Sequence, residues 1–328
     1  MSEKKLRKKF LLLQSNYMSY YMLNDIVNMD NVVICHRKRA FKNSILNFLF
    51  SIHTSGRIQR YIDLPFKNIW DNIIFDKIIK KSCPDYIVFT TSWHSNHLID
   101  YFRKKCENSK LILRFTDTIG NALGPKSESL ILNIKNQYDG VLVYCQEDAE
   151  KYNLSCHSAG YSKINQIELK PRKTYDVVFI GADKGRIEKI RQAYKLFISA
   201  GLSCFFYVIM VKERDRKDDG IIYADKAMSF IDYLSYEMSA KCLFEIVQEG
   251  SSGRTYRMME SIIYNKLLIT NCKEILSTDY YNSKYVQLYN EVSEIDTSFI
   301  SNCPNNLDFH YKGDFSPTRV LEFIEKKW

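Results

Sequence analysis

The 328-residue sequence lacks several features that would assign it to a class at once. No apolar run reaches the roughly 18 residues that a membrane span needs. The basic N-terminal stretch MSEKKLRKKF is followed only by FLLL, which is too short for the core of a secretory signal. The nine cysteines are odd in number and include no CxxC pair. We therefore expect a soluble protein that is not exported and that keeps its thiols reduced.

The sequence has an excess of positive charge. Its 47 Lys and Arg residues face 38 Asp and Glu residues, which gives a net charge of +9. This excess favours an anionic partner, which can be a nucleotide, a nucleic acid or an anionic lipid surface. A basic cluster beside the first apolar run suits either a solvated terminus or contact with an acidic membrane leaflet. Its members are Lys4, Lys5, Arg7, Lys8 and Lys9.

Short apolar runs alternate with helical patterns along the first half of the chain. The expected strands are 10–13, 32–35, 86–90, 111–115 and 140–144, and helical periodicity marks 19–29 and 95–106. Short buried strands that alternate with helices imply a parallel sheet covered on both faces. No repeat of fixed period and no low-complexity segment interrupts this pattern.

The same alternation begins again after the polar stretch 162–175. The expected strands are 177–180, 204–211, 221–224, 242–247 and 267–270, the expected helices are 185–200 and 230–240, and Ser316 with Pro317 opens a last helix. We expect an α/β protein of two Rossmann-like domains that face each other across a cleft. The predicted parts are domains 1–165 and 172–305 and a C-terminal helix, 306–328, that packs back toward the first domain. Ligands of such sheets bind outside the carboxyl ends of the strands.

The first loop of the second half, FIGADKGRIEKI, has the composition of a phosphate site. Gly181 permits a tight turn, and Lys184 and Arg186 stand where the next helix begins. The N-terminus of a helix offers free N–H groups and partial positive charge to an anion. The loop is neither a GxGxxG fingerprint nor a P-loop. A glycine turn with two solvated cations remains the alternative.

The second loop, in CLFEIVQEGSSGRTYRMMESIIY, repeats this design. A flexible stretch, 250–253, precedes Arg254, Thr255 and Arg257 in the first turn of a helix. Cations are unfavourable there unless an anion binds. Glu260 lies one turn further on and can accept hydrogen bonds from the hydroxyls of a ribose. The alternative is a surface ion pair between Arg257 and Glu260, worth under about 1 kcal/mol.

Together these two loops resemble the donor-nucleotide domain of GT-B glycosyltransferases, in particular the bacterial group that assembles lipopolysaccharide and capsular polysaccharide. That group carries a VGxxKGR-like loop, then a QSGxTxRxxE-like loop and a KxLITN strand. The resemblance covers about residues 175–285, and the first half shares only the architecture. The matching positions are Gly181, Lys184, Gly185, Arg186, Ser252, Gly253, Thr255, Arg257, Glu260 and Lys266 to Asn271.

The resemblance implies a donor site with assigned roles. It places Glu260 on the donor ribose and Lys184, Arg186 and Arg257 near the diphosphate. The remaining members of the expected site are Gly181, Ser252, Gly253, Arg254 and Thr255. Two positions depart from the pattern, because Ser251 replaces glutamine and Ser252 stands where retaining enzymes carry a second glutamate. We expect Arg257→Ala and Glu260→Ala to abolish donor binding with the fold intact.

The first half offers two candidates for a catalytic base. Asp117 follows the strand that ends at Phe115, and a carboxylate there can take the proton of an attacking hydroxyl. His94 follows the strand 86–90 and can do the same near neutral pH. Either side chain can instead be a cap or a loop hydrogen-bonding group. Trp93 can stack on an acceptor sugar or pack in the core.

Three other histidines, His36, His97 and His157, give no comparable signal, because they have no partner at a telling spacing.

These observations predict a glycosyltransferase that moves a sugar from a nucleoside-diphosphate donor to a lipid-linked saccharide in capsule or O-antigen synthesis. The expected mechanism is inverting, because Ser252 leaves the retaining signature incomplete. It is expected to be independent of metal, because no DxD motif is evident and arginine, lysine and helix N-termini supply positive charge. We expect no cofactor besides the donor, and a cytoplasmic protein with peripheral contact to the inner face of the membrane. Two alternatives stay open, a non-catalytic nucleotide-binding assembly partner and a nucleic-acid-binding protein.

Overall fold

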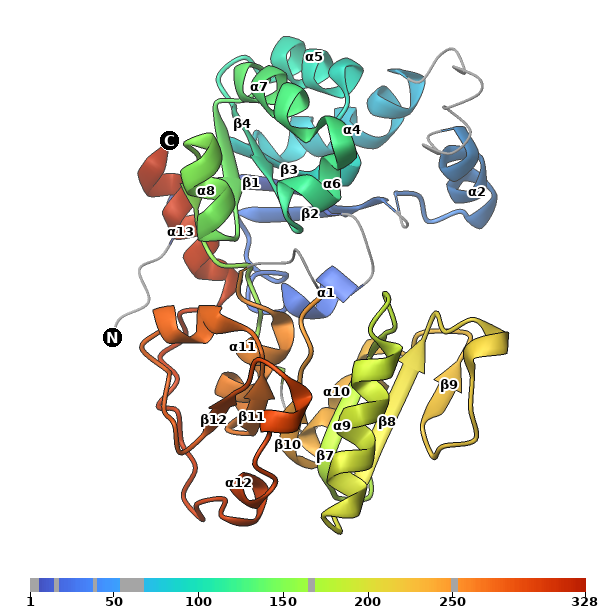
Figure 1. The fold of residues 1–328 in the computed structure, drawn as a ribbon. Coiled ribbons are helices and arrows are strands. Elements are labelled where there is room, and N and C mark those ends of the chain that lie inside the picture. Colours follow the sequence, from blue (N-terminus) through green and yellow to red (C-terminus); the bar gives the residue numbers. More distant parts are fainter. Residues whose placement is uncertain (1–5, 15–17, 38–39, 54–67, 165–168, 249–252) are drawn as a thin grey trace. The chain divides into compact units, whose positions relative to one another are not determined.

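The computed structural model describes residues 6–14, 18–37, 40–53, 68–164, 169–248 and 253–328. The chain divides into two compact units. The first comprises Met1–Ser162 and Phe315–Trp328, and the second comprises Lys163–Asp314. Each unit is an α/β structure with a hydrophobic core of its own (Figure 1).

The first unit is built on a parallel sheet. Its described strands follow the order β2-β1-β3-β4-β5-β6, and every neighbouring pair is parallel. The strands are β1 (Phe10–Gln14), β2 (Val32–His36), β3 (Tyr86–Thr90), β4 (Lys110–Arg114), β5 (Gly140–Val143) and β6 (Ser155–Cys156). The helices are α1 (Met18–Met22), α2 (Ser44–His53), α4 (Asn68–Ser82), α5 (Asn96–Lys105), α6 (Ile119–Leu123), α7 (Ser127–Gln137), α8 (Gln146–Tyr152) and α13 (Pro317–Lys327).

Both faces of this sheet are buried, which explains why its strands read as continuous apolar runs. Successive residues of a strand point to opposite faces. Leu11 and Leu13 of β1 therefore belong to the core that α4, α5 and α7 cover, whereas Phe10 and Leu12 belong to the core on the other face. Helix α13 covers that second face.

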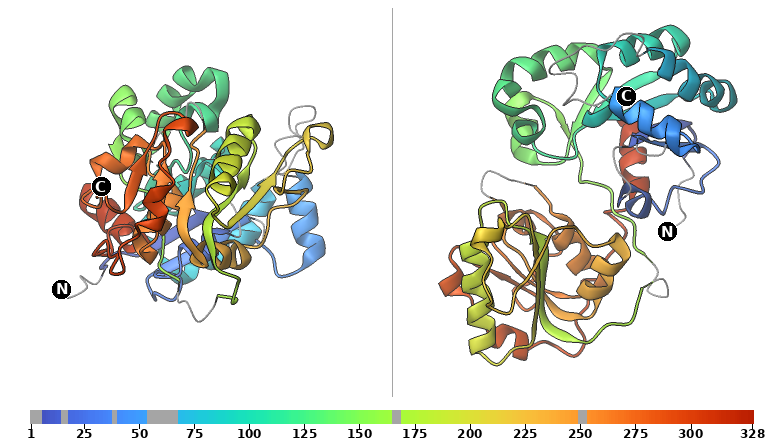
Figure 2. Two further views of the ribbon diagram at one scale, coloured as in Figure 1. Left: turned by 60° about the horizontal axis from the view of Figure 1, so that its bottom comes forward. Right: turned by 90° about the vertical axis from the view of Figure 1, so that its right-hand side faces the viewer.

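Helix α13 begins as predicted. The Ser316 hydroxyl accepts a hydrogen bond from the Thr318 N–H at 3.3 Å, and Pro317 occupies the first helical position. Figure 2 shows α13, in red, beside the blue N-terminal segment of the same unit. At the end of the helix Trp328 packs so closely over Gly140 that a Cβ there would lie 2.2 Å from the ring. The helix therefore completes the core of the first unit.

The second unit repeats the parallel design. Its described strands follow the order β12-β11-β10-β7-β8-β9. They are β7 (Tyr175–Ala182), β8 (Cys204–Ile209), β9 (Ile222–Ala224), β10 (Ala240–Phe244), β11 (Leu267–Thr270) and β12 (Val286–Leu288). The helices are α9 (Ile187–Ser199), α10 (Phe230–Met238), α11 (Tyr256–Tyr264) and α12 (Ser298–Ser301).

Each sheet has a point where the strand order reverses. In the second unit the chain runs from β7 outward to β8 and β9, then returns to the other side of β7 as β10. In the first unit the same reversal separates β1 from β3. Open parallel sheets bind their ligands at the carboxyl ends of the strands beside such a point. The loops after β7 and β10, and those after β1 and β3, are therefore the places to search for sites.

The ten strands predicted from the sequence are confirmed, with ends that differ by at most three residues. The edge strands β6 and β12 were too short to be recognised. The helix predicted for 19–29 is wrong, because α1 ends at Met22 and successive turns follow it. Asn24 and Asp25 lie in these turns, and both residue types compete with a helical backbone through their side chains.

Two expectations about the whole chain can be compared with the structure. Within the described ranges, no helix is both long enough and apolar enough to cross a bilayer. All nine cysteines are described, and each one is a free thiol.

Candidate functional site

The loop after β7 turns tightly into α9. Lys184 and Gly185 adopt positive φ values of 45° and 82°. The Asp183 carboxylate accepts hydrogen bonds from the N–H groups of Arg186 and Ile187, at 2.9 and 2.8 Å. These N–H groups, on which the sequence predicts a phosphate, are thus capped by the chain's own aspartate. Lys184 remains exposed beside them.

Arg186 spans the carboxyl ends of two neighbouring strands. Its Nη2 donates to the Ala182 carbonyl at 2.6 Å, and its Nε donates to the Asp183 carbonyl at 3.1 Å. Its Nη1 donates to the carbonyl of Ile246, just beyond β10. The guanidinium therefore ties the end of β7 to the end of β10.

Arg257, on α11, connects α10 to the end of β7. Its Nε donates to Glu237 Oε1 of α10 at 3.0 Å, and its Nη2 donates to the Ile180 carbonyl of β7. The guanidinium also lies 5.2 Å from the centre of the Phe179 ring. The side chain of Arg257 is 11% exposed and that of Glu237 is 0% exposed, so this is a buried ion pair.

The two guanidiniums are close enough to influence each other. Burial, and then the charge of Arg257, lower the pKa of Arg186 from its ordinary value. Burial alone would also lower the pKa of Arg257, but Glu237 and Glu245 help to raise it above its ordinary value. Because arginine is not deprotonated in proteins, both side chains are positively charged at the switch point between β7 and β10. The predicted convergence of these two cations is present.

Glu260 is fully buried on the second turn of α11. Its Oε2 accepts a hydrogen bond from the Tyr233 hydroxyl at 2.6 Å. Burial and the charges of Glu237 and Glu260 raise the pKa of Tyr233, which keeps this hydroxyl protonated. The ion pair that Arg257 makes is with Glu237, 20 residues earlier in the sequence, instead of with Glu260. A role of Glu260 on a ribose stays a prediction.

The other residues of the expected donor site lie at the same edge of the sheet. Gly253 has a φ of 97°, Arg254 is half-buried, and the Thr255 hydroxyl accepts from the Met258 N–H at 3.1 Å as the N-cap of α11. Gly181 is the seventh residue of β7. Ser252 lies outside the described residues. The structure therefore brings the two predicted loops together at the ends of adjacent strands.

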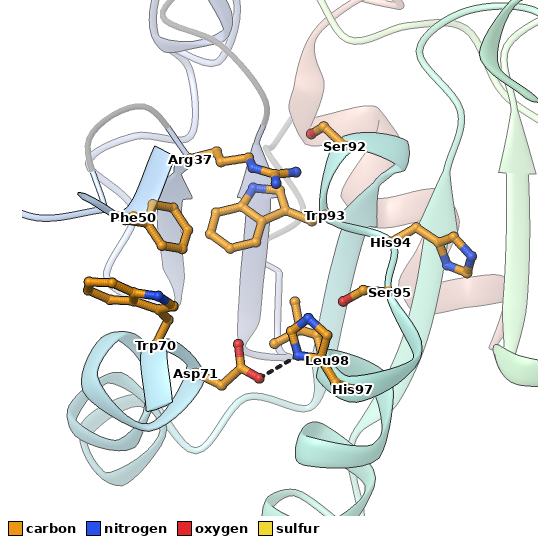
Figure 3. A pocket seen from close by; sticks show the side chains of 10 residues that line it. All are labelled: Arg37, Phe50, Trp70, Asp71, Ser92, Trp93, His94, Ser95, His97 and Leu98. Carbon is orange, nitrogen blue, oxygen red and sulfur yellow. Dashed lines mark hydrogen bonds and ion pairs between the residues drawn. The ribbon is translucent and has the colours of Figure 1, made fainter. Parts of the chain in front are cut away.

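The first unit contains a pocket of about 210 Å³ at the carboxyl edge of its sheet (Figure 3). Aromatic rings form one wall, and the other groups are mostly polar. Arg37 lies with its guanidinium 5.7 Å from the centre of the Trp93 ring, and burial lowers the pKa of Arg37. The lining residues are Arg37, Phe50, Trp70, Asp71, Ser92, Trp93, His94, Ser95, His97 and Leu98.

A histidine and a carboxylate are paired in this pocket. His97 Nδ1 lies 2.8 Å from Asp71 Oδ2. The Asp71 side chain is almost fully buried, whereas His97 is partly exposed. Figure 3 shows the two side chains pointing toward each other from α4 and α5. A carboxylate on one ring nitrogen fixes the tautomer and leaves the other nitrogen able to accept a proton.

The candidate bases predicted from the sequence are placed differently. His94 lines the pocket, but its ring points away from Trp70 and Trp93 (Figure 3), and its Nδ1 is 3.0 Å from the Tyr138 hydroxyl. Burial lowers the pKa of His94. Asp117 is exposed, and its Oδ1 accepts from the Thr118 N–H at 2.8 Å and from Asn121 at 3.1 Å. Asp117 therefore supports the start of α6. Trp93 is buried, and its indole N–H donates a hydrogen bond to the Gln14 carbonyl.

Sequence reasoning missed Asp71 and His97 because they are 26 residues apart on separate helices. The one local signal was a carboxylate inside the apolar pattern NIWDNIIF, where an acid is buried only if it has a partner. Among the described residues, no group of three or more His, Cys, Asp and Glu side chains is placed to hold a metal ion.

No protein-family model matches the sequence, and a search of curated proteins finds no relative. Solved structures are similar to it. HepE from Anabaena, in complex with UDP and glucose, is 10% identical with a TM-score of 0.54 over 98% of this chain and 99% of that one. The apo structure of OtsA is 11% identical with a TM-score of 0.51, over 98% of this chain and 99% of that one. The N-terminal domain of trehalose-6-phosphate phosphatase from Candida albicans is 8% identical with a TM-score of 0.50, over 100% of this chain and 99% of that one.

At these identities the likeness shows the fold alone. The fold is that of GT-B glycosyltransferases, with a parallel α/β sheet in each of two units. The predicted α/β class, with a parallel Rossmann-like sheet in each of two parts of the chain, is confirmed.

The buried ion pair changes what is expected of Arg257→Ala. Because the substitution leaves Glu237 charged and buried, we expect it to lower the free energy of unfolding by about 3–5 kcal/mol, against the expectation of an intact fold. In a matched cycle, the double variant Arg257→Met/Glu237→Leu should lose less than the sum of Arg257→Met and Glu237→Leu. Urea unfolding of all three variants measures this coupling. Strictly additive losses would show that the pair contributes nothing.

Proposed function

We propose that the protein is a glycosyltransferase whose nucleoside-diphosphate donor binds at the carboxyl edge of the second sheet. The observation that carries this proposal is the meeting of Arg186 and Arg257 at the switch point between β7 and β10. The GT-B fold supports it, as does the UDP and glucose present in the HepE structure. Buried positive charge at a strand edge suits a compact anion better than a long nucleic acid.

The cations at this edge divide into two kinds. The guanidinium N–H groups of Arg186 and Arg257 form hydrogen bonds with backbone carbonyls and with Glu237, so these two residues contribute charge and rigidity. Lys184 is exposed and Arg254 is half-buried. We assign these two side chains to direct contact with the diphosphate, where positive charge stabilises the leaving group as it departs.

The acceptor is proposed to be a saccharide whose reacting hydroxyl reaches the pocket of the first unit. In an inverting displacement the acceptor oxygen bonds to the anomeric carbon, the bond from that carbon to the diphosphate breaks, and a base takes the hydroxyl proton. His97 suits this role better than Asp117 or His94, because Asp71 holds its Nδ1 and leaves Nε2 as the acceptor of the proton. No metal is assigned a part in this step.

In biological terms, the proposed setting is the synthesis of a surface polysaccharide on a lipid-linked acceptor at the cytoplasmic face of a membrane. The second candidate function is a nucleotide-binding partner without turnover. It is favoured by one observation, which is that both bases predicted from the sequence, Asp117 and His94, make hydrogen bonds within the first unit.

Nucleotide binding is tested by thermal shift with uridine, guanosine, cytidine and thymidine diphosphates. At a ligand concentration of 100 Kd, binding should stabilise the protein by about 2.7 kcal/mol. Lys184→Ala and Arg254→Ala should each weaken binding about tenfold, because each removes a charged contact. Lys195→Ala, which removes an exposed cation of α9, is the matched control. If no diphosphate shifts the melting temperature, or if all three variants bind like the parent, the donor site is misassigned.

The base is tested with the sugar form of the nucleotide that binds best, by following slow transfer of the sugar to water. His97→Asn should reduce this rate about 100-fold and leave nucleotide affinity unchanged, because general-base catalysis is worth at least this much. Asp117→Asn serves as the comparison and should retain most of the rate. A larger loss of rate in Asp117→Asn than in His97→Asn would assign the role of catalytic base to Asp117. Binding without any turnover in the parent protein would favour the non-catalytic partner.

A further inference from the structure

Helix α2 exposes more apolar surface than any other described helix. Ile45, Phe48 and Leu49 are 67%, 63% and 48% exposed, and Leu46 and Ile52 are also exposed. Phe50 alone is buried, with ring contacts to Phe41, Trp70 and Trp93. One buried side chain thus anchors the helix to the first unit, while roughly half of its circumference presents large apolar groups to solvent.

Exposed apolar residues elsewhere in the described structure are sparse. No other described helix has more than two large exposed hydrophobic residues, and α4, which contacts α2 through Trp70, has Ile69 and Ile73. Single apolar side chains on a surface need no explanation, but a contiguous cluster marks a site of interaction. The cluster on α2 therefore calls for an occupant.

The charge around α2 identifies the kind of occupant. Between Asp30 and Asp63 the sequence has six Lys and Arg residues and no Asp or Glu. Of these cations, Lys42 is exposed two residues before α2, whereas Arg37 lies in the pocket over Trp93. The others are Lys38, Arg39, Arg57 and Arg60, which lie outside the described residues. Apolar side chains flanked by cations match the boundary between acyl chains and anionic headgroups.

We propose that α2 is the element by which the protein docks on an anionic lipid bilayer, with Ile45, Phe48, Leu49 and Ile52 inserted among the acyl chains. This proposal rests on the proposed function in one respect: the proposed function includes contact with a membrane, and α2 is the element assigned to that contact. A second copy of the chain is the weaker choice, since two-fold pairing through α2 brings like charges together.

The position of α2 links the bilayer to the pocket. Phe50 of α2 lines the pocket beside Trp70 of α4, so the helix that carries the exposed apolar cluster also supplies part of a pocket wall. A lipid-linked saccharide can then keep its lipid in the bilayer while its polar end enters the pocket.

The described members of the N-terminal basic cluster, Arg7, Lys8 and Lys9, lie just before β1, at the amino ends of the strands. Lys8 precedes β1 and pairs with Asp85 at 3.6 Å, whereas α2 follows the carboxyl end of β2. Of the two basic regions, the N-terminal cluster and the segment around α2, it is the segment around α2 that combines positive charge with exposed apolar side chains.

The test uses the full chain and vesicles of phosphatidylcholine with about 30% phosphatidylglycerol, in a sedimentation assay. The parent protein should bind these vesicles more tightly than pure phosphatidylcholine, and less tightly at high salt. Phe48→Gln/Leu49→Gln should weaken binding at least about tenfold, because both side chains lose their transfer into the apolar layer. Ile198→Gln/Leu276→Gln removes two exposed apolar side chains of the second unit as the control. Lys42→Glu should reduce binding to the anionic vesicles alone.

Two results would overturn the proposal. The first is equal vesicle binding by the parent and the Phe48→Gln/Leu49→Gln variant. The second is a dimer of the parent that this variant dissociates, since α2 would then contact a second copy. Nucleotide thermal shifts separate this proposal from the proposed function, because the variant should keep them unchanged. Vesicle binding without any nucleotide shift would remove the donor site and leave the docking surface in place.

Discussion

The candidate donor site depends on how the second unit satisfies the carbonyl groups at the ends of β7 and β10. Backbone carbonyls at strand ends that are buried away from water need hydrogen-bond donors. Arg186 supplies them from the residue before α9 and Arg257 from α11, and Glu237 holds Arg257 in place. Positive charge is therefore fixed at the point where the strand order reverses. The loops that carry Lys184 and Arg254 take their positions from this frame.

Much of this architecture could be read from the sequence. Buried parallel strands appear as short apolar runs, and ten of them were found because both sheet faces are covered. The two loops at the ends of β7 and β10 were also recognised, since each places cations at the start of a helix, where the helix dipole disfavours them. The edge strands β6 and β12 were not predicted, because two or three residues are too few to show a hydrophobic pattern.

The pairings inside the sites could not be predicted, because they join residues that are distant in sequence. Nothing near Arg257 indicates that its partner is Glu237 rather than Glu260, since only the packing of α10 against α11 brings the first acid within reach. The same holds for Asp71 and His97. The exposed face of α2 was also invisible, because an apolar sequence is the same whether the residues face a core or the solvent.

The two units therefore offer different chemistry. The second unit presents cations and a fully buried glutamate, which suit a nucleoside diphosphate. The first unit presents an aromatic pocket with a paired histidine, and beside it a helix suited to lipid. This division agrees with a reaction between a soluble donor and an acceptor held at a membrane.

Hydrogen exchange with and without a saturating nucleoside diphosphate tests the central claim most directly, because it locates the ligand on the chain. We predict slower exchange in residues 181–187 and 253–258, at the ends of β7 and β10, with little change in the described parts of the first unit. Protection confined to the first unit, or no protection at either loop, would contradict the account.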